Sequence, residues 1–87
     1  MSWQLLFTKA AQKDAGKLAS AGLRPKAEPL LEILKTNPWQ APPPYEKLVG
    51  DLAGAHSRRI NFQHRLVYAV DEETHTVRVL RMWSHYG

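Results

Sequence analysis

The alternation of apolar and polar residues predicts a strand and then a helix at the start of the chain. An apolar run at residues 3–7 indicates the strand. Thr8 can cap the following helix through its hydroxyl, and Gly22 can end it in the left-handed conformation that glycine favours. The apolar residues between these two positions recur at helical spacing: Ala10, Ala11, Ala15, Leu18 and Ala19.

A second helix is predicted between two prolines. Pro25 fits the first turn of a helix, where the N–H that proline lacks would have no partner within the helix. Pro38 ends the helix because a residue that precedes proline avoids the helical conformation. The apolar stripe of this helix consists of Ala27, Leu30, Leu31 and Leu34. Residues 37–45 hold four prolines in nine positions, and we interpret them as a stiff loop that presents Glu46 in a fixed direction.

The second half of the chain has the pattern of a sheet. Strands are predicted at residues 56–60, 65–70 and 76–83, with a polar turn at residues 71–74. The middle strand is apolar on both faces, which is typical of a central strand. The connections are short and therefore favour antiparallel pairing. In the last strand we expect one face to hold Val77 and Val79, and the other Leu80 and Met82.

The order of these elements predicts an α+β fold. One strand, two helices and a meander of three strands (β-α-α-β-β-β) give an antiparallel sheet with both helices packed on one face. A chain of 87 residues is long enough for one domain, which we expect to span residues 1–87.

The composition narrows the classes of protein to consider. Twelve Lys and Arg against eight Asp and Glu give a net charge of +4, which favours an anionic partner such as nucleic acid, an anionic membrane or an acidic protein. There is no cysteine, so disulfides and thiolate zinc sites are excluded. The chain has neither a signal-peptide pattern nor an apolar run close to the roughly 20 residues of a membrane helix. We therefore expect a soluble, cytoplasmic protein without a membrane partner.

Several kinds of enzyme site are missing from the sequence. The one acidic cluster, residues 71–73, falls in a predicted turn, where a solvated hairpin tip is the simpler interpretation. The four histidines lack the spacing of zinc sites. There is no glycine-rich phosphate loop and no nucleophile elbow. We therefore expect no metal ion and no other cofactor.

Metal-free cleavage of RNA requires a base, an acid and fixed cations around the phosphate. The candidates for these roles are Glu46, Arg59, Arg65 and His85, with Tyr86 beside the last. Taken alone, Glu46 is also compatible with an ordinary surface glutamate, and His85 with a frayed terminus. Arg58 and Arg59 must point to opposite faces of their strand. Arg59 and Arg65 can meet one phosphate only on a shared face. We predict that a three-residue connection at residues 61–63, or a bulge with the same effect, pairs them.

The second half of the chain resembles a known family at these residues. The runs Ser57-Arg58-Arg59-Ile60 and His64-Arg65-Leu66-Val67-Tyr68-Ala69-Val70 are similar to those of the YoeB (Txe/YoeB) toxins of bacterial toxin–antitoxin pairs. Residues 45–48, 50–54 and 81–86 extend the resemblance, which spans residues 45–86. The first half agrees with the family in its layout only.

The resemblance implies a RelE-like microbial ribonuclease fold and cleavage of messenger RNA in the ribosomal A site. It implies that Glu46 is the general base and His85 the general acid. Arg59 and Arg65 would support the transition-state phosphate, and Tyr86 would help to shape the site. A cognate antitoxin of the YefM/Axe kind would bind and block the toxin. The oligomeric state stays open, with a homodimer as one alternative.

Further residues are candidates for contact with RNA or the ribosome: Lys47, Arg58, His64, Arg78 and Trp83. Exposed aromatic side chains can stack on bases, and we consider Trp39, Trp83 and Tyr86 for this role, with core packing as the alternative for the two tryptophans. The chain departs from the family at His56, where an aromatic residue is usual, at Phe62, and in the prolines at 42–44. These departures bear on how the substrate is positioned.

Two other classes of function remain as alternatives. One is a non-catalytic inhibitor on the same scaffold, like the ParE-type toxins that act on DNA gyrase. Those toxins generally lack the glutamate, arginine and histidine set found here. The other is an RNA-binding module without catalysis.

Overall fold

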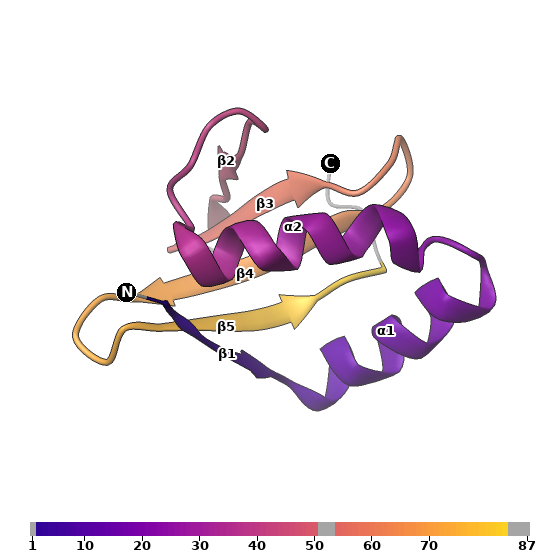
Figure 1. Ribbon diagram of the computed structural model, residues 1–87, viewed down its shortest axis with the longest axis horizontal. Coiled ribbons are helices and arrows are strands. Elements are labelled where there is room, and N and C mark those ends of the chain that lie inside the picture. The colour runs from indigo at the N-terminus through magenta and orange to yellow at the C-terminus, as the bar shows by residue number, and fades with distance from the viewer. Residues whose placement is uncertain (1, 51–53, 84–87) are drawn as a thin grey trace.

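The computed structural model describes residues 2–50 and 54–83, and its elements follow the predicted order (Figure 1). These elements are β1 (Gln4–Phe7), α1 (Lys9–Ser20), α2 (Arg24–Thr36), β2 (Glu46–Lys47), β3 (Ala55–Arg59), β4 (Arg65–Asp71) and β5 (Thr76–Arg81). The described strands form one sheet of five strands in the order β1-β5-β4-β3-β2. The prediction that the apolar strand β4 is central is confirmed.

Both helices begin and end where the sequence indicated. The Thr8 hydroxyl accepts a hydrogen bond of 3.1 Å from the backbone N–H of Ala11, so Thr8 caps α1. Gly22 follows α1 with a φ of 74°, a conformation that costs little without a Cβ atom. Pro25 lies in the first turn of α2, and Asn37 is extended before Pro38. Among the described helices, none combines the length and the apolar composition of a membrane-spanning segment.

The α+β prediction is confirmed, but the sheet is mixed rather than wholly antiparallel. The three long strands of the second half, β3, β4 and β5, pair in antiparallel fashion as expected. β1 adds to β5 in parallel, with Gln4 opposite Thr76. The preference for antiparallel pairing applies to strands joined by short connections, whereas β1 and β5 are separated by most of the chain. The short strand β2, absent from the prediction, pairs with the edge of β3.

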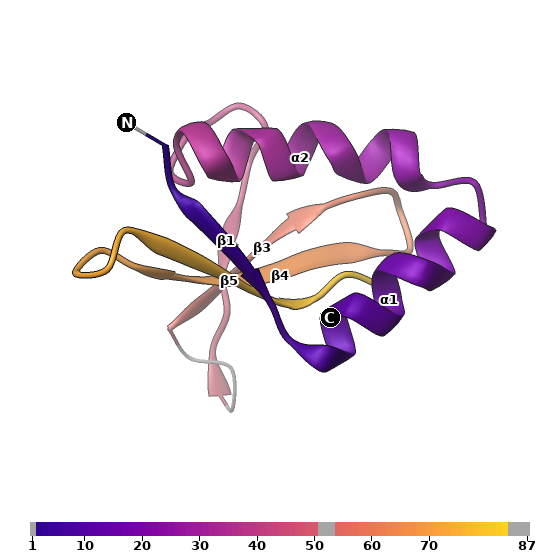
Figure 2. The ribbon, with the colours of Figure 1, turned by 60° about the horizontal axis from the view of Figure 1, so that its bottom comes forward.

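The hydrophobic core lies between the two helices and one face of the sheet (Figure 2). The helices contribute Ala11, Leu18, Ala27, Leu30 and Leu34, and the sheet contributes Leu66, Tyr68, Val77 and Val79. Because side chains alternate along a strand, the residues between these sheet positions point to the opposite side, which we call the distal face.

The alternation in β5 changes at Leu80. Val67 lies opposite Arg81 but Tyr68 lies opposite Val79, so Leu80 is an extra residue that forms a β-bulge. The bulge shifts the following residues by one position. Met82 therefore packs in the same core as Val77 and Val79, and the prediction that it shares a separate face with Leu80 is wrong.

Candidate active site

Three of the candidate catalytic residues line one cavity on the distal face. The cavity has a volume of about 250 Å³ and is lined by Pro44, Glu46, Ser57, Arg59 and Arg65. Strand pairing produces this grouping, because Glu46 lies opposite Ser57 and Arg59 lies opposite Arg65. The predicted pairing of the two arginines is thus confirmed. The connection also follows the prediction, since the N–H of Ile60 donates to the carbonyl of His64 at 2.9 Å.

The charges in this cavity are arranged around Arg65. Its Nη1 atom lies 3.4 Å from Oε2 of Glu46. The same nitrogen donates a hydrogen bond of 3.3 Å to the Ser57 hydroxyl. The Arg65 side chain is 18% exposed, whereas Glu46 is 66% exposed. A half-enclosed guanidinium and an accessible carboxylate can therefore both meet a ligand that enters from solvent.

Arg59 completes the cationic side of the cavity. It is exposed at the end of β3, directly across from Arg65. Two guanidiniums on paired strand positions form a preorganised site for an anion such as phosphate, because each offers several N–H donors in a fixed plane. Chemically, the cavity combines a proton acceptor with a pair of anion-binding cations.

Comparison with known proteins identifies the family. A model of the YoeB-like toxin of bacterial type II toxin–antitoxin systems matches residues 9–86. The chain belongs to this family. Comparison with curated proteins finds no match.

Solved structures agree with membership of the YoeB-like toxins. A YoeB/ParE toxin from Agrobacterium tumefaciens has a TM-score of 0.85 and 30% identity, over 95% of this chain and 99% of that one. A YoeB-YefM complex from Staphylococcus aureus gives a TM-score of 0.79 and 29% identity, over 99% and 100%. The YoeB dimer from the same organism gives 0.80 and 28%, over 99% and 100%.

In this YoeB-like toxin Arg58 is buried, although the sequence made it a candidate for contact with RNA. As predicted, it points away from Arg59, but it is only 1% exposed. Its guanidinium donates to Tyr68 and to backbone carbonyls of the loop at residues 37–45. A side chain enclosed in this way cannot reach an RNA backbone, so the prediction of contact with RNA is wrong for Arg58.

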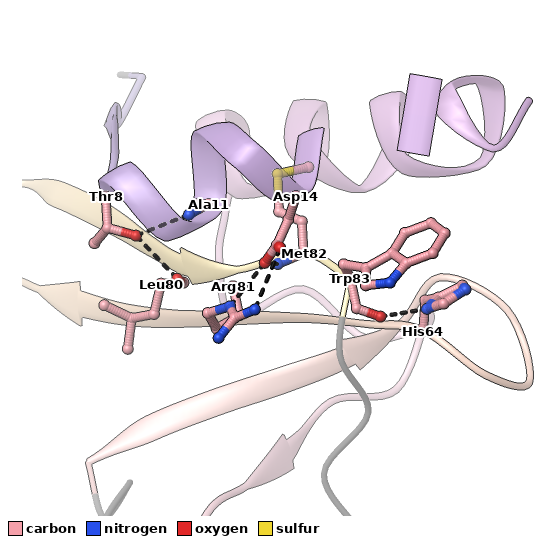
Figure 3. A network of polar contacts seen from close by, with 8 residues as sticks. All are labelled: Thr8, Ala11, Asp14, His64, Leu80, Arg81, Met82 and Trp83. Carbon is pink, nitrogen blue, oxygen red and sulfur yellow. Dashed lines mark hydrogen bonds and ion pairs between the residues drawn. The ribbon is translucent and has the colours of Figure 1, made fainter. Parts of the chain in front are cut away.

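His64 and Trp83 contact each other at the end of the sheet (Figure 3). Their rings stack with centroids 4.0 Å apart, and the Nδ1–H of His64 donates to the carbonyl of Trp83. Both residues are half-buried, and Trp83 also packs against the core. Their contact with RNA stays a prediction.

The remaining candidates differ in what the structure says of them. Lys47 and Arg78 are exposed, and Arg78 lies on the distal face opposite Ala69. Trp39 is 36% exposed and packs edge-on against His56. His85 and Tyr86 lie outside the described residues.

Asp14, a buried carboxylate in α1, was not among the residues predicted from the sequence. It accepts hydrogen bonds from Arg81 Nε at 2.7 Å and from the N–H of Met82 at 3.1 Å, and so fixes the chain just after β5 (Figure 3). Burial alone would raise the pKa of Asp14, but these hydrogen bonds and the charge of Arg81 outweigh burial and lower the pKa below 3.8. A charged residue three positions after Ala11 on the apolar stripe was the available signal.

Ser57 was also overlooked as a member of the cavity. It is 1% exposed and contacts Arg65 from the neighbouring strand. The available signal was its position two residues before Arg59, which places both side chains on one face of β3.

Proposed function

We propose that this YoeB-family toxin is an endoribonuclease that cuts messenger RNA on the ribosome and thereby stops translation. One observation carries the proposal: Glu46, Arg59 and Arg65 gather in a single cavity. A carboxylate beside two guanidiniums supplies a proton acceptor next to a site for phosphate, as RNA cleavage through the 2′-hydroxyl requires.

In the proposed reaction, the scissile phosphate binds between Arg59 and Arg65. An anion there competes with Glu46 for Arg65, so the carboxylate is released to face the 2′-hydroxyl. Glu46 takes the 2′-hydroxyl proton while the 2′-oxygen attacks phosphorus. His85 gives a proton to the 5′-oxygen as the bond from phosphorus to that oxygen breaks. The products are a 2′,3′-cyclic phosphate and a 5′-hydroxyl, and the scheme uses no metal ion.

The partners follow from the same proposal. Structures of the Staphylococcus aureus relative include a YoeB-YefM complex and a YoeB dimer. We propose that an antitoxin of the YefM/Axe kind binds this chain and blocks the cavity, and that the chain can form a homodimer. The ribosome and messenger RNA would be the targets, in the cytoplasm. Tyr86, Lys47 and Arg78 would contact RNA or the ribosome around the cleavage site.

The sharpest test replaces Glu46 with Gln, which keeps the size of the side chain and removes its basicity. The rate of cleavage should fall about 100-fold to 10,000-fold, the usual contribution of a proton-transfer group. Glu28→Gln is the matched control, because Glu28 is an exposed glutamate on α2 that is paired with Arg24. Primer extension on messenger RNA in translating extracts measures the cleavage. Equal rates for Glu46→Gln and the parent would contradict the assignment of the base.

The products and the requirement for the ribosome separate this function from its alternatives. Mass spectrometry of the cut RNA should show 2′,3′-cyclic phosphate ends, and 3′-hydroxyl ends would exclude the mechanism. Cleavage should occur on ribosome-bound messenger RNA and be weak or absent on free RNA. Inhibition of gyrase without cleavage would favour the ParE-like alternative, and RNA binding without any cut would favour a binding module.

A further inference from the structure

The loop at residues 37–45 has few means of fixing its own shape. Pro38, Pro42, Pro43 and Pro44 have no N–H, so this stretch offers many carbonyl acceptors and few backbone donors. A turn at its start is closed by the N–H of Gln40, which donates to the carbonyl of Asn37 at 3.0 Å. β2, which follows the loop and contains Glu46, is two residues long. Two side-chain bonds add to this turn, from the N–H of Trp39 to Oδ1 of Asn37 at 3.0 Å and from Nε2 of Gln40 to the carbonyl of Pro42 at 3.4 Å. The carbonyls of Pro38, Gln40 and Pro43 receive their donors from Arg58, outside the loop.

Arg58 supplies those donors. Its Nη1 donates to the carbonyl of Pro43 at 2.6 Å. Its Nη2 donates to the carbonyls of Pro38 at 2.8 Å and Gln40 at 2.7 Å. Its Nε donates to the Tyr68 hydroxyl at 3.1 Å. Both ends of the loop are thus held by one planar group, whose own orientation is set from β4.

Aromatic rings enclose this guanidinium next to Glu46. The Cζ atom of Arg58 lies 4.9 Å from the ring centroid of Tyr45, the residue immediately before Glu46. The Tyr45 ring contacts those of Trp39 and His56, with centroids 6.2 Å and 5.6 Å away. The cluster of Arg58 and these rings therefore connects the middle of the loop to the residue that precedes the candidate base.

Residues on both faces of β3 help to position Glu46. On the distal face, Ser57 pairs with Glu46 and lines the cavity. On the helix face, Arg58 holds the loop that leads into Glu46. We propose that Arg58 is a positioning residue, which fixes the catalytic carboxylate of Glu46 by holding the proline loop from the opposite side of the sheet. This inference rests on the proposed function, in which Glu46 is the base.

The test is Arg58→Lys, which keeps the charge but replaces a planar fork by a single ammonium group. One ammonium on a flexible stem cannot reproduce this set of donors to three separated carbonyls and the Tyr68 hydroxyl. We expect kcat for cleavage to fall about 100-fold, the cost of a displacement of about 1 Å in a catalytic group, with KM for messenger RNA little changed. Arg24→Lys, on exposed α2, should keep both constants. A full kcat in folded Arg58→Lys would overturn the proposal.

Tyr68→Phe gives a second, milder variant, because it keeps the packing and removes one acceptor of Arg58. It should lower kcat in the same direction and by less. Trp39 reports the loop independently of activity: in a background with Trp3 and Trp83 replaced by Phe, Arg58→Lys should make Trp39 more accessible to a fluorescence quencher. Unchanged quenching in Arg58→Lys would show that the loop does not depend on Arg58.

A double-mutant cycle shows whether Arg58 acts through Glu46. If it does, Arg58→Lys should change the rate little once Glu46 is Gln, because the group being positioned is no longer a base. Additive losses would show that Arg58 has a general structural role and would overturn the proposal. Full activity of Glu46→Gln alone would instead refute the proposed function, and the Trp39 measurement would still decide whether Arg58 holds the loop.

Discussion

Arg58 and Arg59 are neighbours in sequence and have opposite environments. Arg58 is 1% exposed and satisfied by backbone carbonyls and a tyrosine hydroxyl, whereas Arg59 is exposed beside the cavity. Burying a guanidinium is costly unless its N–H groups find hydrogen-bond acceptors. The groups that accept from Arg58 therefore determine where this side chain can lie as much as its charge does. Asp14 follows the same rule with a carboxylate.

Replacing Asp14 by Asn should lower the free energy of unfolding and make it depend less on pH in the acidic range. The pKa of Asp14 is lower in the folded than in the unfolded chain, so its contribution is present above about pH 4 and is lost as pH falls below that value. At neutral pH we expect a loss of about 1–3 kcal/mol rather than the larger cost of a fully buried pair, since Arg81 is 36% exposed. Urea denaturation over a pH series measures both effects. Glu72→Gln, at the exposed hairpin tip, should reproduce neither.

His56→Phe should remove a loss of stability under mildly acidic conditions. Burial, followed by the charges of Lys47 and Arg58, lowers the pKa of His56 below 6.5. As pH falls below about 6.5, the unfolded chain binds a proton that the folded chain resists, so stability declines. Phenylalanine cannot titrate, and it leaves no unpaired ring nitrogen among Trp39, Tyr45 and Tyr68. Thermal denaturation at pH values between about 5 and 7 should show that the melting temperature of the variant depends less on pH than that of the parent. An equal dependence on pH in the two proteins would contradict this prediction.

At the scale of elements, the Thr8 side chain is one of the links between α1 and β5, beside the pair of Asp14 and Arg81. The hydroxyl of Thr8 caps α1 by accepting from Ala11, and it donates to the carbonyl of Leu80 at 2.9 Å. Leu80 is the extra residue of the bulge in β5. The cap therefore also stabilises the irregular point after which the chain continues towards His85.

Thr8→Val should destabilise the protein by about 1–2 kcal/mol, because it keeps the shape of the side chain and removes both hydrogen bonds of the hydroxyl. Thr8→Ser keeps the hydroxyl and should cost less. The free energy of unfolding from urea titrations compares the two variants. A serine variant as unstable as the valine variant would show that packing of the methyl group, and not the cap, is what matters.

At the scale of the whole molecule, the hydrophobic core and the candidate catalytic cavity lie on opposite sides of the sheet. The helix side holds the core, and the distal side holds the candidate catalytic cavity and Arg78. Under the proposed function, RNA approaches the distal side, and the net charge of +4 assists its approach.

Salt should weaken the binding of single-stranded RNA, and the distal face should account for part of this effect. Each phosphate contact contributes about 0.7 to the slope of log affinity against log salt. Arg78→Gln should reduce the slope by about that amount, whereas Arg24→Gln, an exposed arginine on α2, should leave it unchanged. Fluorescence anisotropy over a salt series measures the slope. Equal effects of the two variants would show that RNA does not favour the distal face.

Local rules in the sequence were sufficient for the helices, the caps and the hairpin register. Pro25, Thr8 and Gly22 act on their own neighbours, and the three-residue connection after Ile60 sets which residues of β3 and β4 meet. These are short-range effects of backbone sterics and loop length, so they can be read without knowledge of the fold. The pairing of Arg59 with Arg65 was predicted for this reason.

Only the tertiary structure decided the features that depend on distant partners. The parallel contact of β1 with β5 and the burial of Asp14 join segments far apart in the chain, and the bulge residue Leu80 accepts a hydrogen bond from Thr8 at the chain's other end. Alternation placed Arg58 and Arg59 on opposite faces, but it could not say that the proline loop would cover Arg58. The burial of a charged side chain depends on which segments pack over it, and those segments come together only when the whole chain folds.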